Sequence, residues 1–173
     1  MTTFTLSSPD LTNGAAIPQH FEFDGFGCSG RNESPALAWQ GAPEGTKSFA
    51  ITMHDPDAPS QSGWWHWLVV DLPADTQKLT PNAGAVAKKG EAAHSALPAG
   101  ARQMRNDFGA MGWGGVCPPP GDKSHRYLFT VHALKVDKLD IPDDATGGLT
   151  SFMINANALA TASFTALYAR PAA

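Results

Sequence analysis

The stretch Trp67-Leu68-Val69-Val70-Asp71-Leu72 is apolar on both of its faces, and Pro73 follows it directly. A strand that is covered on both faces has a nearly continuous apolar sequence. This stretch therefore predicts a strand in the middle of a sheet, and the proline marks its end.

Two further strands are predicted on either side of this stretch in the chain. Phe49-Ala50-Ile51-Thr52-Met53 alternates in polarity, with Phe49, Ile51 and Met53 on one face, and Asp55-Pro56 ends it. Arg126 to Leu134 has the same two-residue period. Its shared face carries His125, Tyr127, Phe129 and Val131.

The rest of the chain is less regular. Residues 73–124 are rich in Gly, Ala and Pro, and long irregular stretches in compact domains are often functional. Thr150 to Ala160 predicts a short helix with Thr150 as a candidate cap. Ser163 to Tyr168 predicts a last strand, with continuation of the helix as the alternative. We expect one domain, residues 1–173, that is mostly antiparallel β with one or two peripheral helices.

Composition supports this fold class and excludes some functions. Gly (17) and Pro (14) make up 31 of 173 residues, or about 18%, whereas the usual share is ~12%. This composition favours turns and strands over a helix bundle. The net charge is -4 and the longest basic run is Lys88-Lys89, so no nucleic-acid partner is expected. No apolar run approaches the ~18 residues of a membrane span.

The N-terminal sequence and the two cysteines both bear on the compartment of the protein. Met1 to Ser7 has neither the basic residues nor the apolar core of a signal peptide, so we expect a cytoplasmic protein. In that compartment Cys28 and Cys117 are expected to be two thiols rather than a disulfide. They show no CxxC spacing, which argues against a structural zinc site.

The loop Asp55-Pro56-Asp57-Ala58-Pro59 is the first candidate for function. The prolines fix φ on both sides of the second aspartate, so the loop is stiff and its carboxylates are aimed in advance. The competing interpretation is an ordinary turn after a strand, with Asp hydrogen-bonding its own backbone.

Two more segments carry polar groups at predicted strand ends. His66 opens the central strand, where it is either a core histidine or a site residue. Gly114-Gly115 allows close approach of a ligand to backbone N–H groups, and Pro118 to Pro120 forms a rigid wall before His125 and Tyr127. A Gly/Pro surface loop is the alternative, but it does not explain a His and a Tyr on one strand face.

Taken together, these segments resemble the phosphatidylethanolamine-binding protein (PEBP) family, and within it the bacterial and archaeal Raf-kinase-inhibitor-like YbhB/YbcL branch. The similarity runs in family order over nearly the whole chain. The matching segments are Ser34-Pro35-Ala36-Leu37-Ala38-Trp39, Asp55-Pro56-Asp57-Ala58-Pro59, His66-Trp67-Leu68-Val69-Val70, Arg105-Asn106-Asp107-Phe108-Gly109, Gly114-Gly115-Val116-Cys117-Pro118-Pro119 and His125-Arg126-Tyr127.

The resemblance implies a large antiparallel sheet packed with a smaller sheet, a C-terminal helical element, and a cavity that accepts phosphate or phosphoryl head groups. The cavity residues that it implies are Asp55, Asp57, Pro59, His66, Gly115, Pro118, His125 and Tyr127. The chain departs from the family pattern at Ala36, Asp71 and Asn157. The last departure leaves open whether the C-terminal element gates the cavity.

The function predicted from these residues is non-enzymatic binding of a phosphate-type anion, without a cofactor. In this hypothesis the aspartates orient and charge His66 and His125, because a nearby carboxylate raises a histidine pKa. The protonated rings, the Gly115 N–H and the Tyr127 hydroxyl then face the anion. Alternatively, the aspartates accept from the ammonium of an ethanolamine head group.

Other functions stay open as alternatives. Asp55, Asp57, His66 and His125 are also ligand types for a metal-dependent hydrolase, although no HExxH-type motif is present. Ser60, Ser62 and a Cys117–His125 pair are weaker nucleophile candidates. The resemblance also implies a kinase or protease partner, and Trp64 with Trp65 suggests a homodimer contact.

Overall fold

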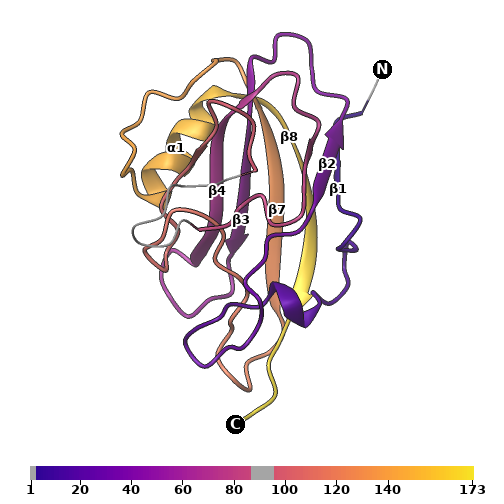
Figure 1. The fold of residues 1–173 in the computed structure, drawn as a ribbon, viewed down its shortest axis with the longest axis vertical. Helices are drawn as coiled ribbons and strands as arrows, with labels where there is room; N and C mark the ends of the chain where they lie inside the picture. Colours follow the sequence, from indigo (N-terminus) through magenta and orange to yellow (C-terminus); the bar gives the residue numbers. More distant parts are fainter. Residues whose placement is uncertain (1–2, 87–95) are drawn as a thin grey trace.

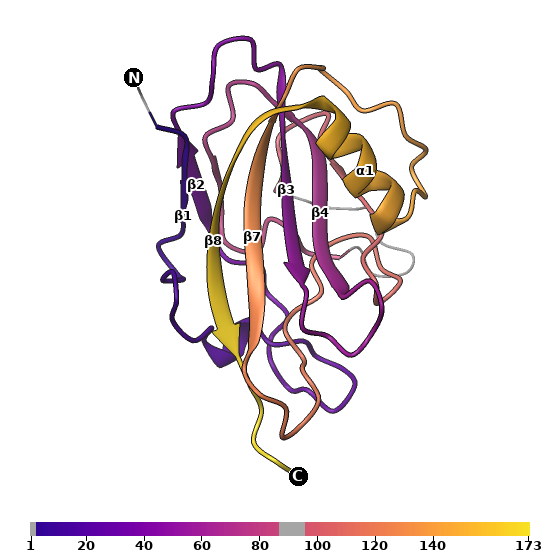
Figure 2. The same ribbon diagram turned by 180° about the vertical axis from the view of Figure 1, so that it is seen from behind.

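A computed structural model describes residues 3–86 and 96–173, and it has two antiparallel sheets (Figures 1 and 2). The large sheet has the strand order β6-β4-β3-β7-β8, and the small sheet has the order β1-β2-β5. The large sheet comprises β3 (Ser48–Asp55), β4 (Trp64–Pro73), β6 (Arg102–Gln103), β7 (His125–Leu134) and β8 (Ala158–Tyr168), and the small sheet β1 (Thr5–Ser7), β2 (Leu37–Gln40) and β5 (Lys78–Leu79). This confirms the predicted fold class.

Apolar residues cover the large sheet on both faces. On one face, Phe49, Ile51 and Met53 of β3 share a core cluster with the small sheet, as their alternation predicted. On the other face, residues of β3 and β4 pack with Ile154 of helix α1 (Gly147–Asn157). Because β4 contributes Val69 to the first cluster and Leu68 and Val70 to the second, its central residues are apolar on both faces.

The C-terminal elements differ in their boundaries from the prediction. The helix begins at Gly147 rather than Thr150, because the Thr146 side chain accepts a hydrogen bond from Leu149 N and caps it. Thr150 is buried inside the helix. The last strand is confirmed but starts at Ala158, so helix and strand follow each other directly. No helix in the described ranges is long and apolar enough to cross a membrane.

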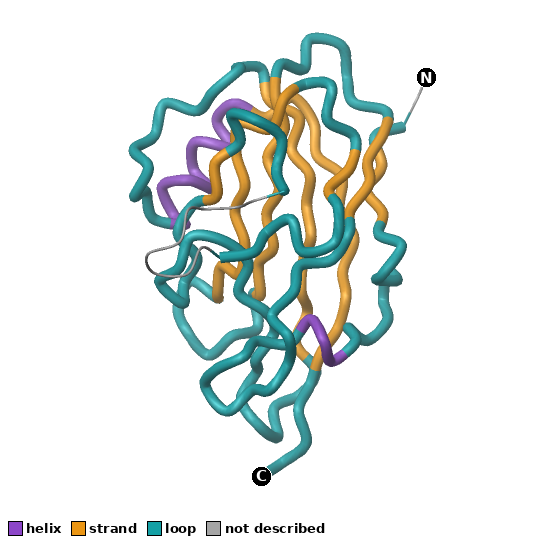
Figure 3. The backbone as a smooth tube through the Cα atoms, in the orientation of Figure 1, coloured by secondary structure: helices purple, strands orange, loops and turns teal. Residues whose placement is uncertain are grey.

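The segment between β4 and β7 is mostly loop, as predicted (Figure 3). Its only strands in the described residues are β5 and β6, and residues 87–95 lie outside them. A short 3-10 helix, Gln19–Phe21, lies near the N-terminus. Asp71, one of the departures from the family pattern, accepts hydrogen bonds from Arg102 Nε and Leu139 N and so fixes the loop after β7.

The prediction of two free thiols is wrong. Cys28 and Cys117 form a disulfide, although 89 positions separate them in the sequence. The error came from the assumed compartment, because in a reducing cytosol two distant cysteines are usually thiols. The disulfide removes one argument for a cytoplasmic location, since such bonds persist mainly in oxidising compartments.

Candidate functional site

A cavity of about 250 Å³ lies where β3 ends and where β4 and β7 begin. Neighbouring strands are antiparallel, so Asp55 at the end of β3 pairs with Trp64 at the start of β4. The three segments singled out in the sequence therefore meet at one end of the large sheet, where these central strands end or begin. The polar lining residues are Asp55, His66, His125 and Tyr127, and the others are Phe26, Ala58, Pro59, Trp64, Phe108, Cys117, Pro118 and Pro119.

His125 is held between two carboxylates. Its Nδ1 lies 2.7 Å from Asp55 Oδ2, and its Nε2 lies 2.9 Å from Asp122 Oδ2. Burial lowers the pKa of His125, but the hydrogen bonds to Asp55 and Asp122 outweigh burial and leave the pKa above its ordinary value. Carboxylates only accept, so these two contacts favour the protonated ring, which donates from both nitrogens. The predicted outer N–H is not free for a ligand, because Asp122 accepts from it.

His66 is not the protonated group that the sequence argument assumed. It is buried, and its Nδ1 lies 2.7 Å from the carbonyl oxygen of Gly114. A carbonyl only accepts, so Nδ1 carries the proton and Nε2 is an acceptor. Burial lowers the pKa of His66 to about 4, so the ring is neutral at neutral pH. No carboxylate of the described residues hydrogen-bonds to His66, so burial is the largest influence on its pKa.

Tyr127 lines the cavity and carries a hydroxyl group. Its ring packs edge-on against His66, with 5.3 Å between the ring centroids. The hydroxyl is buried and has no hydrogen-bond partner among the described residues. Burial raises the pKa of Tyr127, so the hydroxyl stays protonated and can donate.

Asp57 does not line the cavity. Its carboxylate accepts two hydrogen bonds from the Arg126 side chain, each 3.0 Å long, and one from Arg126 N. These bonds lower the pKa of Asp57. Its backbone N–H donates to Asp55 Oδ1, which is the turn geometry offered as the alternative interpretation of this loop. Asp57 therefore shapes the loop and pairs with Arg126, and it does not hold a histidine.

Gly115 is also outside the cavity lining. Its N–H donates to Asn32 Oδ1 at 2.7 Å, so it is not available to an anion. A side chain at this position would collide with Phe21 O and would lie 2.6 Å from Phe23 N. The glycine is thus required for close packing against residues 21–23 rather than for ligand contact.

Several residues of the site were missed in the sequence. Phe26 and Phe108 supply apolar wall, and Asp122 accepts from the charged histidine. Trp64 also lines the cavity, while Trp65 lies against Gly147 of α1, so both tryptophans have contacts within the chain. Only Asp122 had a usable signal, because it stands three positions before His125 in the same turn.

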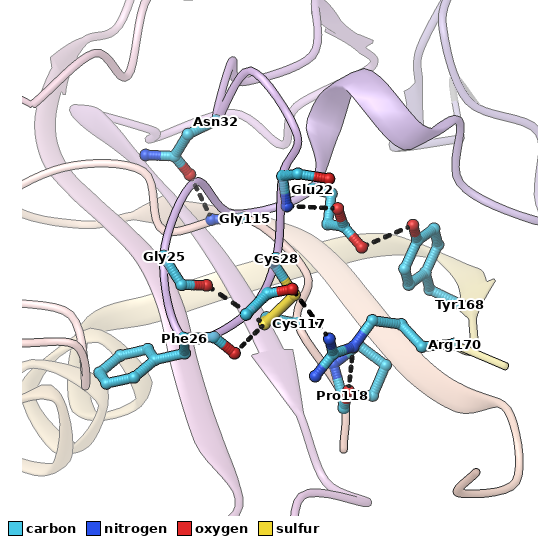
Figure 4. The surroundings of a disulfide bond; sticks show 12 residues. Glu22, Gly25, Phe26, Cys28, Asn32, Gly115, Cys117, Pro118, Tyr168 and Arg170 are labelled. Atoms are coloured by element: carbon cyan, nitrogen blue, oxygen red, sulfur yellow. Dashed lines mark hydrogen bonds between the residues drawn. A yellow bond between two sulfur atoms is a disulfide. The ribbon is translucent and has the colours of Figure 1, made fainter. Parts of the chain in front are cut away.

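The disulfide joins the cavity wall to a loop at its rim (Figure 4). Cys117 lines the cavity, whereas Cys28 belongs to the loop that carries Phe26. Arg170 strengthens this link, because its side chain donates to Pro118 O at 2.7 Å and to Gly27 O at 3.3 Å. The C-terminal segment therefore supports the wall of the cavity, while α1 packs on the opposite face of the sheet.

The catalytic alternatives find little support in this geometry. Within residues 3–86 and 96–173, no group of three or more His, Cys, Asp or Glu side chains is arranged to hold a metal ion. Asp57 is turned to Arg126, so the four residues of the metal hypothesis do not converge. Cys117 is in a disulfide and is no thiol nucleophile, and Ser60 Oγ donates to Gly63 O rather than to a base.

Fold and site define a class: a two-sheet β protein with a small, mostly apolar cavity at the ends of three neighbouring strands. The family model described as phosphatidylethanolamine-binding protein matches residues 7–169. The chain belongs to this family, as the resemblance implied.

Two Escherichia coli (strain K12) proteins are similar over almost the whole chain. The UPF0098 protein YbcL is 49% identical over 165 residues, which cover 95% of this chain and 87% of YbcL. The UPF0098 protein YbhB is 46% identical over 163 residues, covering 94% and 98%. The crystal structure of YbcL, reported as a new member of the mammalian PEBP family, matches with a TM-score of 0.89 and covers 96% of this chain and 98% of that one.

Proposed function

We propose that this protein binds a small ligand with a phosphoryl head group in the cavity, and that it acts by binding rather than by catalysis. The observation that carries the proposal is the Tyr127 hydroxyl, which is a buried donor without a partner among the described residues and belongs to a residue that lines the cavity. Leaving a buried polar group unpaired costs about 1–3 kcal/mol, which a ligand oxygen would offset. The family description supports phosphoryl chemistry.

The cavity offers acceptors as well as donors. Asp55 and the Nε2 of neutral His66 accept, and the Tyr127 hydroxyl donates. A phosphate monoester with one proton has a P–OH donor and unprotonated acceptor oxygens, so it matches both kinds of group. The ammonium of an ethanolamine head group would donate to the same acceptors.

The charges of the lining favour a monoanion over a dianion. Asp55 and protonated His125 have opposite charges and are hydrogen-bonded to each other. The second hydrogen bond of His125 goes to Asp122, whose side chain is 39% exposed. An incoming anion would displace this exposed carboxylate and accept from His125 Nε2 in its place.

The test is a calorimetric titration with methyl phosphate from pH 5.5 to 8.5. The second pKa of a phosphate monoester is about 6, so the monoanion disappears as the pH rises. We expect the affinity to weaken over this range, for this reason rather than through titration of His66. Affinity that stays constant over the range would contradict the proposal.

Two controls locate the effect. Dimethyl phosphate has no second proton, so its affinity should change less with pH. Tyr127→Phe removes only the hydroxyl, and we expect it to weaken methyl phosphate binding about tenfold at pH 5.5, the size of one lost hydrogen bond. Equal affinity in wild type and Tyr127→Phe would remove the observation on which the proposal rests.

A protein partner such as a kinase or a protease would extend this proposal, since the cavity loops are at the surface. A pull-down whose bound proteins are released by methyl phosphate would support such a partner. A homodimer is a separate prediction, and light scattering measures it directly.

A further inference from the structure

Phe26 is an exposed aromatic residue in an unfavourable backbone conformation. Its side chain is 73% exposed and its φ is 53°. Left-handed φ values cost a bulky residue about 1–2 kcal/mol, and a ring that is mostly exposed gains little from burial. Phe26 therefore combines an unfavourable backbone conformation with an exposed apolar ring, and it lies on the cavity wall.

The loop that carries Phe26 is firmly held (Figure 4). The disulfide fixes Cys28, two residues further on, to Cys117 in the wall. Arg170 donates to Gly27 O, and the N–H of Ser29 donates to Glu22 Oε2 at 3.0 Å. The ring of Phe26 is thus presented at the cavity and does not lie on a loose surface loop.

Phe26 belongs to a stack of aromatic rings. Phe23 and Phe108 stack with 4.0 Å between ring centroids, and Phe26 stacks on both at 5.7 Å. Trp64 meets Phe108 edge-on at 5.1 Å. Stacked and edge-to-face aromatic pairs at these distances are attractive, and a ligand ring that joins them gains a similar contact.

The polar part and the aromatic part of the cavity lining differ in their exposure to solvent. The polar residues Asp55, His66 and His125 are almost fully buried, whereas Phe26 and Pro59 are exposed members of the wall. A ligand whose head group reaches the polar residues therefore holds its remaining part against the aromatic rings. This argument rests on the proposed function and adds the part of the ligand that the proposal leaves unspecified.

We propose that Phe26 is a specificity residue that contacts an apolar, preferably aromatic, group esterified to the phosphoryl head of the ligand. The cavity then selects phosphate esters with such a group over inorganic phosphate and over methyl phosphate. The disulfide and Arg170 position the ring for this contact.

The experiment compares the dissociation constants of methyl phosphate and phenyl phosphate at pH 5.5. For the wild type we expect phenyl phosphate to bind about tenfold more tightly, equivalent to 1.4 kcal/mol. For Phe26→Ala we expect this ratio to fall below about two. Phe152→Ala is the matched control, because Phe152 is 69% exposed but lies on α1, on the other face of the sheet, and it should keep the wild-type ratio.

The outcomes separate this inference from the proposed function. If neither ester binds, the proposed function fails and the inference fails with it. If methyl phosphate binds but phenyl phosphate binds no better, or if Phe26→Ala keeps the wild-type ratio, only the inference is overturned. A fall of the ratio in Phe152→Ala as well would also overturn it, because any exposed phenylalanine would then have the same effect.

Discussion

The pKa values of the two cavity histidines are shifted in opposite directions, although both rings lie against Tyr127. His125 meets two carboxylates, which favour the charged ring, whereas His66 meets a carbonyl and is neutral at neutral pH. Burial disfavours the charged form of both rings, so the hydrogen-bond partners decide the difference. The anion-binding hypothesis therefore needs one cationic ring, not two.

The opposite pKa shifts have opposite consequences for stability. The pKa of His125 is raised in the folded protein, so its contribution is complete below the unfolded value of about 6.5 and is lost as the pH rises through the folded value. The pKa of His66 is lowered to about 4, so the unfolded chain takes up a proton first as the pH falls below about 6.5. Acid therefore destabilises the fold through His66.

His132 gives a test of this acid effect away from the cavity. Its Nε2 lies 2.9 Å from Thr52 Oγ1 under α1, and burial lowers its pKa to about 4. Between pH 6.5 and 4 it should cost roughly 3 kcal/mol of unfolding free energy. His132→Gln should lose less stability over that range than the wild type in urea unfolding. The exposed His20→Gln is the control, and identical pH slopes for wild type and His132→Gln would refute the argument.

Asp122 provides a second test at the level of one residue. Its exposed carboxylate accepts the hydrogen bond that an anion would need from His125. Asp122→Ala should therefore bind methyl phosphate several-fold more tightly at pH 5.5, where Asp55 still holds the ring protonated. Asp143→Ala, which removes an 89% exposed carboxylate from Arg102, should bind like the wild type. Weaker binding by Asp122→Ala would mean that Asp122 supports the ligand rather than competes with it.

Much of the site was predictable from the sequence because three strands end together. Asp55, Pro59, His66, Pro118, His125 and Tyr127 all line the cavity. The roles of Asp57 and Gly115 were not predictable, because two aspartates in one loop look alike until Arg126 selects one of them. The protonation of His66 also depends on a carbonyl 48 positions away, which no local pattern reveals.

Among the structural elements, the rim loop depends most on a single bond. The Cys28–Cys117 disulfide closes a loop of 89 positions, and removing a native disulfide typically costs about 2–5 kcal/mol. Adding a reductant should lower the free energy of unfolding of the wild type by about this amount, and its urea midpoint should fall accordingly. The double variant Cys28→Ser/Cys117→Ser should unfold at the lower urea midpoint both with and without the reductant. Equal midpoints for reduced and oxidised wild type would show that the bond contributes nothing to the fold.

The strands were predicted better than the elements that join them. The apolar runs of β3, β4 and β7 fix both faces of the sheet, because a shift by one residue would expose the core face. The start of α1 was missed because Thr146 and Thr150 are equally good caps in sequence, and only the hydrogen bond from Leu149 N distinguishes them. The disulfide was missed because its partners meet only through tertiary structure.

At the scale of the whole molecule, one core cluster links the two ends of the chain. It includes Leu6 of β1, Phe49 of β3 and Phe164 of β8. We therefore expect residues 1–173 to unfold as one domain, with coincident transitions by circular dichroism and by tryptophan fluorescence. Two separated transitions would contradict a single domain.

The compartment of the protein is also a property of the whole molecule. A cytoplasmic location was expected from the N-terminal sequence, but the disulfide is typical of an oxidising compartment. Trapping of free thiols in intact cells decides between them: unreacted cysteines indicate the oxidised form, and complete labelling indicates reduced protein in the cytosol.

The central claim is that the cavity at the ends of β3, β4 and β7 binds a phosphoryl group. A crystal structure of the protein with methyl phosphate tests it most directly. We expect the phosphoryl oxygens within hydrogen-bond distance of the Tyr127 hydroxyl and of His66 Nε2, with the Asp122 carboxylate turned away from His125. An empty cavity with Tyr127 still unpaired, or methyl phosphate bound only elsewhere on the surface, would contradict the claim.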